Sequence, residues 1–163
     1  MTDRLDSLQL IYLDMTGELD PLSYIEDPSY KWSICETDYG GKPLFVRRNV
    51  TAEEWIGHAE LPVKLGFAVP LELSNEYGLP NPEESEVLNA VEDLIIHYLN
   101  SQTRGIHALV LTTGRMKEFV FYIPHNVDIQ AIHENIKQSV PEHDVQCMAV
   151  NEPDWESFQL FGV

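Results

Sequence analysis

Basic residues are scarce in this chain of 163 amino acids. Ten lysines and arginines stand against 27 aspartates and glutamates, which leaves a formal net charge of −17 with histidine neutral. Because a surface of that sign repels phosphate backbones and anionic lipid headgroups, we expect no direct binding to nucleic acid or to a membrane. The same surface attracts basic proteins, unless the acidity only keeps the protein soluble.

Long apolar runs and cysteines are also few. The longest apolar run, residues 106–113, is far too short to span a bilayer. The N-terminus lacks the basic start and the unbroken apolar stretch of a secretory signal, which predicts a cytoplasmic protein. The two cysteines, Cys35 and Cys147, show no CxxC spacing and are predicted to be buried, inert thiols in a reducing compartment.

Sequence signatures of catalysis and of metal binding are absent as well. The six histidines form neither an HxxxH nor an HExxH pattern, and no serine lies in a Gly-x-Ser-x-Gly turn. Gly40, Gly41 and Gly114 fall in expected hairpin turns and not before helices, which argues against a phosphate-binding loop. We therefore expect no metal and no cofactor, and the sequence favours a protein without catalytic activity.

The chain does contain a regular alternation of strands and helices. Two β-rich runs within residues 105–124 flank Thr113-Gly114-Arg115-Met116, which is typical of a tight antiparallel hairpin. An asparagine cap followed by proline predicts that a helix begins at Asn81. The remaining predicted elements are a strand over 64–69, a helix over 128–139 and a strand over 144–150.

From residue 64 the predicted order of elements is β-α-β-β-α-β. This order indicates an α+β fold of the ferredoxin-like, split βαβ type, with two helices on one face of one sheet. A further hairpin over residues 31–48 either extends that sheet or folds over its open face. Residues 1–29 are expected to form an N-terminal segment with a short amphipathic helix around Leu5, Leu8 and Tyr12, and residues 30–163 a single domain.

The central hairpin has two different faces if its turn centres on Gly114-Arg115. One face is expected to pack beneath the helices, and it contains Ile106, Ala108, Val110, Phe119, Phe121 and Ile123. The opposite, outer face contains His107, Leu109, Leu111, Glu118, Val120 and Tyr122. Because the outer face is too apolar to be left in water, we expect the N-terminal segment, the C-terminal tail or a partner to cover it.

Several short stretches, in this order and spacing, resemble a bacterial family that is catalogued as domain of unknown function 695. They are Gly66-Phe67 to Pro70, Glu76-Tyr77-Gly78-Leu79-Pro80, Glu92-Asp93, Thr113-Gly114-Arg115, Phe119 to Tyr122 and Pro153-Asp154-Trp155. The resemblance covers roughly residues 30–160. It implies a fold similar to that of the ribonuclease E inhibitor B-like regulators, which are small acidic proteins, and it brings no catalytic residues with it.

Together these observations predict a non-enzymatic acidic protein that binds and regulates a basic protein, as a monomer or a homodimer. The residues expected to contact the partner are His107, Leu109, Leu111, Glu118, Val120 and Tyr122, with Arg115 at the hairpin tip and Tyr77 in the loop before Asn81. The alternative is a small-molecule-binding protein or an enzyme, whose pocket lies on the open sheet face and uses His107, Glu118 and Tyr122.

Overall fold

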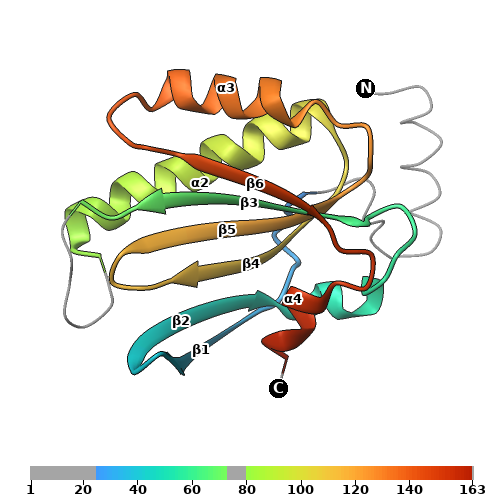
Figure 1. The fold of residues 1–163 in the computed structure, drawn as a ribbon, viewed down its shortest axis with the longest axis horizontal. Helices are drawn as coiled ribbons and strands as arrows, with labels where there is room; N and C mark the ends of the chain where they lie inside the picture. The colour runs from blue at the N-terminus through green and yellow to red at the C-terminus, as the bar shows by residue number, and fades with distance from the viewer. Residues whose placement is uncertain (1–24, 73–79, 163) are drawn as a thin grey trace.

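The protein is built on a six-stranded antiparallel sheet. The computed structural model describes residues 25–72 and 80–162. Every neighbouring pair of strands is antiparallel, in the order β1-β2-β4-β5-β3-β6 (Figure 1). The helix predicted around Leu5 and the loop that contains Tyr77 lie outside the described residues. The strands are β1 (Trp32–Tyr39), β2 (Lys42–Asn49), β3 (Val63–Pro70), β4 (Ile106–Thr112), β5 (Met116–Ile123) and β6 (Gln146–Asn151).

Two long helices begin where the sequence provides a capping side chain. These helices are α2 (Pro82–Gln102) and α3 (Ile129–Ser139). The Asn81 side chain accepts a hydrogen bond from the Glu84 N–H at 2.8 Å, and the Asp128 side chain accepts one from the Ala131 N–H at 3.1 Å. Each bond satisfies a backbone donor that the first helical turn leaves free, so both predicted helices are confirmed.

Two short helices complete the described elements. The 3-10 helix η1 (Val50–Trp55) follows β2, and α4 (Glu156–Leu160) lies in the C-terminal tail, where the sequence pattern predicts no regular element. Figure 1 shows α2 and α3 side by side along the sheet, and α4 close to η1.

The chain order β3-α2-β4-β5-α3-β6 confirms the predicted succession of elements. Strands β3 and β4 are both antiparallel to β5, so α2 connects two parallel strands that have β5 between them. In the same way, α3 connects β5 and β6, which both pair with β3. The β1–β2 hairpin pairs with β4 and extends the sheet, which decides between the two arrangements that the sequence leaves open.

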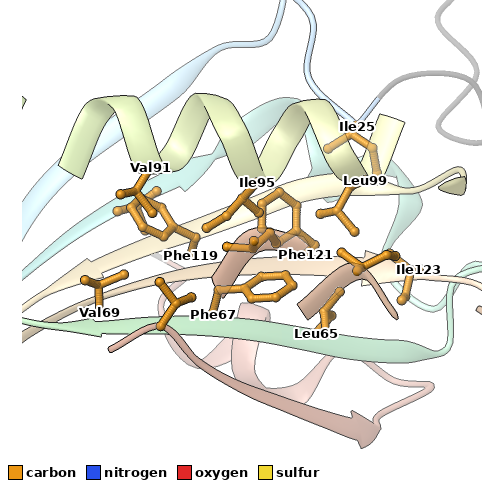
Figure 2. Packing of buried hydrophobic residues seen from close by; sticks show 14 of the residues in the cluster. Ile25, Leu65, Phe67, Val69, Val91, Ile95, Leu99, Phe119, Phe121 and Ile123 are labelled. Carbon is orange, nitrogen blue, oxygen red and sulfur yellow. The ribbon is translucent and has the colours of Figure 1, made fainter. Parts of the chain in front are cut away.

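The core between the long helices and the sheet follows from two periodicities. Every second strand residue and every third or fourth helix residue turns toward it. Figure 2 shows Val91, Ile95 and Leu99 of α2 directed toward Phe119 and Phe121 of β5. The buried residues of this cluster are Ile25, Val63, Leu65, Phe67, Val69, Leu88, Val91, Ile95, Leu99, Val110, Phe119, Phe121, Ile123, Ile132, Ile136 and Val145.

A second cluster covers the opposite sheet face, and the C-terminal tail supplies its centre. The Trp155 ring stacks on the Tyr122 ring with 4.1 Å between centroids and 7° between planes, and the Phe158 ring meets it edge-on. The sequence suggests the N-terminal segment, the C-terminal tail or a partner as the cover of this face. The structure shows that the C-terminal tail covers part of it. The buried residues of the second cluster are Tyr30, Leu44, Val46, Ala52, Leu61, Ile106, Ala108, Leu109, Val120, Tyr122, Trp155 and Phe158.

A β-bulge between His107 and Leu109 changes which residues of β4 face the helices. Because a bulge inserts one extra residue into a strand, the alternation of faces shifts there by one. His107, and not Ala108, therefore lies opposite Phe121, on the helix side of the sheet. The predicted faces are wrong for His107, and also for Ile106 and Ala108, which belong to the second cluster.

Candidate functional site

The outer hairpin face, which the sequence suggests as a contact surface, is largely covered by the chain itself. Leu109 and Tyr122 are fully buried, and Val120 is 2% exposed. All three belong to the second cluster, and Leu111 is partly buried against it. In this structure Leu109, Val120 and Tyr122 stabilise the fold and are not available to a partner.

Tyr122 takes part in a polar network that fastens α4 to the sheet. Its hydroxyl donates to Glu152 Oε1 at 2.6 Å and accepts from the Phe158 N–H at 3.3 Å. Ser157 also donates to Glu152, through its N–H at 2.9 Å and its hydroxyl at 2.8 Å. Burial raises the pKa of Tyr122 above its ordinary value, and the bond to Glu152 adds to this. Burial also opposes the ionisation of Glu152, but the bonds from Tyr122 and Ser157 and the charge of Lys64 outweigh it and lower the pKa of Glu152.

Glu118 is half-buried on the outer face, where its side chain lies against Gly66. A Cβ atom built on Gly66 would come within 2.6 Å of Glu118 Oε2, so the carboxyl group occupies space that a larger residue would fill. Burial raises the pKa of Glu118, and the charge of Lys64 offsets this only in part. His107 lies on the opposite side of the sheet and Tyr122 beneath the tail, so these three groups do not form one pocket.

We expect the substitution Glu118→Gln to stabilise the protein at neutral pH and to have little effect in acid. The folded protein holds the Glu118 proton to a higher pH than the unfolded chain does, so this group makes stability fall as the pH rises above its unfolded pKa. Glutamine keeps the shape and removes the ionisation. Urea unfolding, followed by circular dichroism at about pH 4 and about pH 7, measures the difference. A variant that is less stable than the unmodified protein at neutral pH would contradict this account.

Arg115 lies at the tip of the β4–β5 hairpin, where its backbone holds the turn. Its N–H donates to the Thr113 hydroxyl at 3.1 Å, and its carbonyl accepts from the Leu71 N–H at 2.8 Å. The residue is exposed and immediately precedes β5, whereas Tyr122 lies at the opposite end of that strand. A role for Arg115 or for Tyr77 in binding stays a prediction.

The two cysteines have different surroundings. Cys35 is exposed on β1, which corrects the prediction that it is buried, because β1 is an edge strand with only β2 beside it. Cys147 is half-buried, and burial raises the pKa of its thiol to about 11. The Cys147 thiol is therefore protonated at neutral pH and a weak nucleophile.

His107 is fully buried in a polar cluster on the helix side of the sheet. Its ring stacks on Phe121 with 4.4 Å between centroids, and the Trp32 ring meets it edge-on at 5.0 Å. Neither ring nitrogen has a hydrogen-bond partner among the described residues. The Nδ1 atom lies 3.6 Å from Glu26 Oε1 and 3.8 Å from Glu92 Oε2. Because burying polar atoms without partners costs stability, this cluster is a candidate for function.

Glu26 reaches the imidazole because the segment before β1 is anchored to β4 and α2. The His107 N–H donates to the Ile25 carbonyl at 2.8 Å, and the Ile25 N–H donates to the Asn100 side chain at 3.3 Å. The Ile25 side chain is fully buried in the first cluster. The next residue, Glu26, is thereby fixed beside His107.

Glu92 on α2 and Arg47 on β2 form an ion pair at the edge of the same cluster. The Arg47 guanidinium also lies over the Trp32 ring, 4.9 Å from its centroid, where the negative face of an aromatic ring attracts a cation. Lys117 on β5 is a further charged neighbour. Burial lowers the pKa of Lys117, and the charge of Glu92 counteracts this only in part.

A surface pocket of about 440 Å³ opens beside this cluster, and we name it the Trp32 pocket. Its lining combines an aromatic and an aliphatic side chain with three carboxylates and one guanidinium. Apolar side chains beside a few charged groups are the usual composition of a ligand-binding pocket. The lining residues are Glu26, Trp32, Arg47, Asn89, Glu92, Asp93 and Ile96.

Sequence reasoning misses the Trp32 pocket because its residues come from four separate parts of the chain. One member precedes β1, and the others lie on β1, β2 and α2. A local signal exists for Glu92, which follows Leu88 by four residues and precedes Ile95 by three, on the buried stripe of α2. A carboxylate on a buried stripe needs a partner, and that partner is Arg47.

Within residues 25–72 and 80–162, no group of three or more acidic, histidine or cysteine side chains comes together as a metal site. No helix in this part of the chain is long and apolar enough to cross a membrane.

Comparison with known proteins gives a family but no activity. No curated protein and no solved structure matches the chain. The model of one family matches residues 30–161, a range that contains every strand and helix described above, and this confirms the family resemblance seen in the sequence. The chain therefore belongs to the family of unknown function DUF695.

Proposed function

We propose that this protein binds and regulates a basic protein, and that it does so without catalysis. The acidic side of α2 carries this proposal. The helix contains five carboxylates and neither lysine nor arginine, and Glu83, Glu86 and Asp93 are exposed. Glu86 and Asp93 are seven residues apart and so share one side of the helix. Asp93 lines the Trp32 pocket, which means that this acidic side leads into the pocket.

Two further surface pockets support the same interpretation, because carboxylates line both. Glu72, Glu83 and Glu84 line one of about 250 Å³ beside the start of α2. Glu36 and Asp38, together with Lys42, line another at the β1–β2 turn. A basic partner is drawn toward such a surface by long-range attraction, and dissolved salt screens that attraction.

Removing exposed carboxylates from α2 should weaken binding more than removing the same charge elsewhere. We expect about a tenfold loss of affinity for the α2 variant at low salt and less than about a threefold loss for the control. The α2 variant combines Glu83→Gln, Glu86→Gln and Asp93→Asn, and the control combines the exposed Glu54→Gln, Glu60→Gln and Glu134→Gln.

The partner for this measurement comes from affinity capture on the tagged protein at low salt. Mass spectrometry identifies what is retained, and calorimetry then gives the Kd of the purified partner at low and high salt. A basic partner whose affinity falls with salt supports the proposal. The absence of any retained basic protein, or an affinity that does not change with salt, would overturn it.

The order of the strands supports a finer description of the fold. We interpret β3-α2-β4-β5-α3-β6, with the strand order β6-β3-β5-β4, as a ferredoxin-like split βαβ unit to which the β1–β2 hairpin adds two strands. Similarity to the ribonuclease E inhibitor B-like regulators, a bacterial origin, a cytoplasmic location and a monomeric or homodimeric state stay predictions.

A further inference from the structure

We infer that the Trp32 pocket receives an arginine side chain of the basic partner. The inference rests on the proposed function, because it assigns one contact of that interaction to one place on the chain. Three features of the pocket carry it, namely unused carboxylate acceptors, an apolar wall and a guanidinium that the protein already holds in the same way.

The carboxylates of the pocket have acceptor capacity that the described part of the chain does not use. Glu26 Oε1 is buried without a hydrogen-bond partner there, and the Glu26 side chain, which is 32% exposed, lines the pocket. Asp93 is exposed at the rim. A guanidinium has five N–H donors in a planar fork, which suits a pair of carboxylates better than a single acceptor does.

His107 gives an independent sign that the site is incomplete. Its Nδ1 atom is directed at Glu26 and Glu92, but distances of 3.6 and 3.8 Å are too long for good hydrogen bonds. The imidazole is fully buried and therefore cannot find its missing partners in bulk water. Of these two carboxylates, Glu92 has Arg47 as its partner, whereas Glu26 Oε1 has no donor among the described residues. A cation that enters from the pocket can supply one.

The apolar wall suits the stem of an arginine. Trp32 and Ile96 are both partly buried, so the methylene groups of an incoming side chain can pack against them while the charged head reaches the carboxylates. Tryptophan is also the aromatic side chain that attracts a cation most strongly.

The protein already holds one guanidinium in this manner. Arg47 lies over Trp32 and pairs with Glu92, so its charge is compensated within the chain. Glu26 and Asp93 then remain for a second guanidinium. Arginine is preferred to lysine here, because the ammonium group is more strongly hydrated and lacks the planar fork.

Titration of the full chain with N-acetyl-arginine N-methylamide tests this inference. The binding is followed in proton–nitrogen NMR spectra through the indole N–H of Trp32 and the backbone amides of Asn89 and Asp93. We expect saturable shifts in the millimolar range, at least about fivefold weaker binding of the lysine analogue, and none of the neutral citrulline analogue.

Variants locate the binding on the chain. Glu26→Gln should weaken binding of the arginine compound at least about fivefold, whereas the exposed Glu54→Gln should leave it unchanged. The absence of saturable shifts at Trp32, equal shifts with the citrulline compound, or unchanged binding to Glu26→Gln would each overturn the inference.

The inference and the proposed function fail in different ways. If the captured partner binds in a salt-dependent manner but Glu26→Gln does not weaken it, the pocket assignment is wrong and the proposed function stands. If the arginine compound binds at Trp32 but no basic protein is retained, the pocket assignment stands and the proposed function is wrong.

Discussion

Replacing Trp155 with alanine should lower the free energy of unfolding by about 3–5 kcal/mol. The ring is fully buried and stacks on Tyr122. Its Nε1–H donates to the Leu61 carbonyl at 2.8 Å. Alanine leaves a cavity in the second cluster and a buried carbonyl without its donor, and both cost stability. Trp155 has a φ of 55°, and alanine must adopt the same left-handed conformation, so no relief of backbone strain offsets the loss.

The substitution Trp155→Phe separates the two contributions. Phenylalanine keeps a ring on Tyr122 but loses the N–H donor, and we expect it to cost about 1–2 kcal/mol. Urea unfolding followed by circular dichroism gives both values, provided that the slope of the unfolding free energy against urea concentration is the same in the variants and in the unmodified protein. If Trp155→Ala lowers the free energy of unfolding by less than about 1 kcal/mol, the tail is not part of the core. The outer face would then be open to a partner.

The order of strands and helices could be predicted because its signals are local. Asn81 caps α2 through the backbone three residues away, and Asp128 caps α3 in the same way. The hairpin turn at Thr113-Gly114 is equally local, since the Thr113 N–H donates to the Met116 carbonyl at 2.9 Å. Signals of this kind are complete within a few residues and do not depend on the rest of the fold.

The cover of the outer face and the bulge in β4 depend on contacts between distant segments. Trp155 is fixed by a carbonyl 94 residues earlier in the chain, and nothing in the tail itself points to Leu61. The alternation of residues in β4 predicts a regular strand, whereas the observed register accommodates the bond from the His107 N–H to the Ile25 carbonyl. Because of the one extra residue in the bulge, His107 lies on the helix side of the sheet, beside the Trp32 pocket, and not on the predicted outer face.

Of the candidate site, the general acidity could be predicted, but not the pocket. The aromatic ring of Trp32 and the guanidinium of Arg47 come from the β1–β2 hairpin. The sequence does not decide that this hairpin pairs with β4. Glu26 lies in a segment with no readable pattern of its own. A site assembled from four segments becomes visible only when the sheet order is known.

Gly105→Ala should cost roughly 3 kcal/mol or more, which is large for the addition of one methyl group. Gly105 immediately precedes β4 and has a φ of 145°, a conformation that other residues rarely adopt. A Cβ atom there would lie 2.5 Å from the Tyr122 carbonyl oxygen and 2.9 Å from Ile123 Cγ2. The Tyr122 carbonyl belongs to the backbone of β5. The clash with the added methyl group can therefore be relieved only if β4 and β5 separate where they begin to pair.

Gly40→Ala is the matched control for Gly105→Ala. Gly40 also has a positive φ, of 61°, but a Cβ atom there would meet nothing within 4 Å. We expect it to cost only about 1–2 kcal/mol from backbone conformation, measured by urea unfolding as before. Equal losses in the two variants would mean that close packing at Gly105 is not limiting. A larger loss at Gly105, accompanied by weaker binding of the arginine compound, would instead show that the start of β4 also positions Glu26, through the bond between His107 and Ile25.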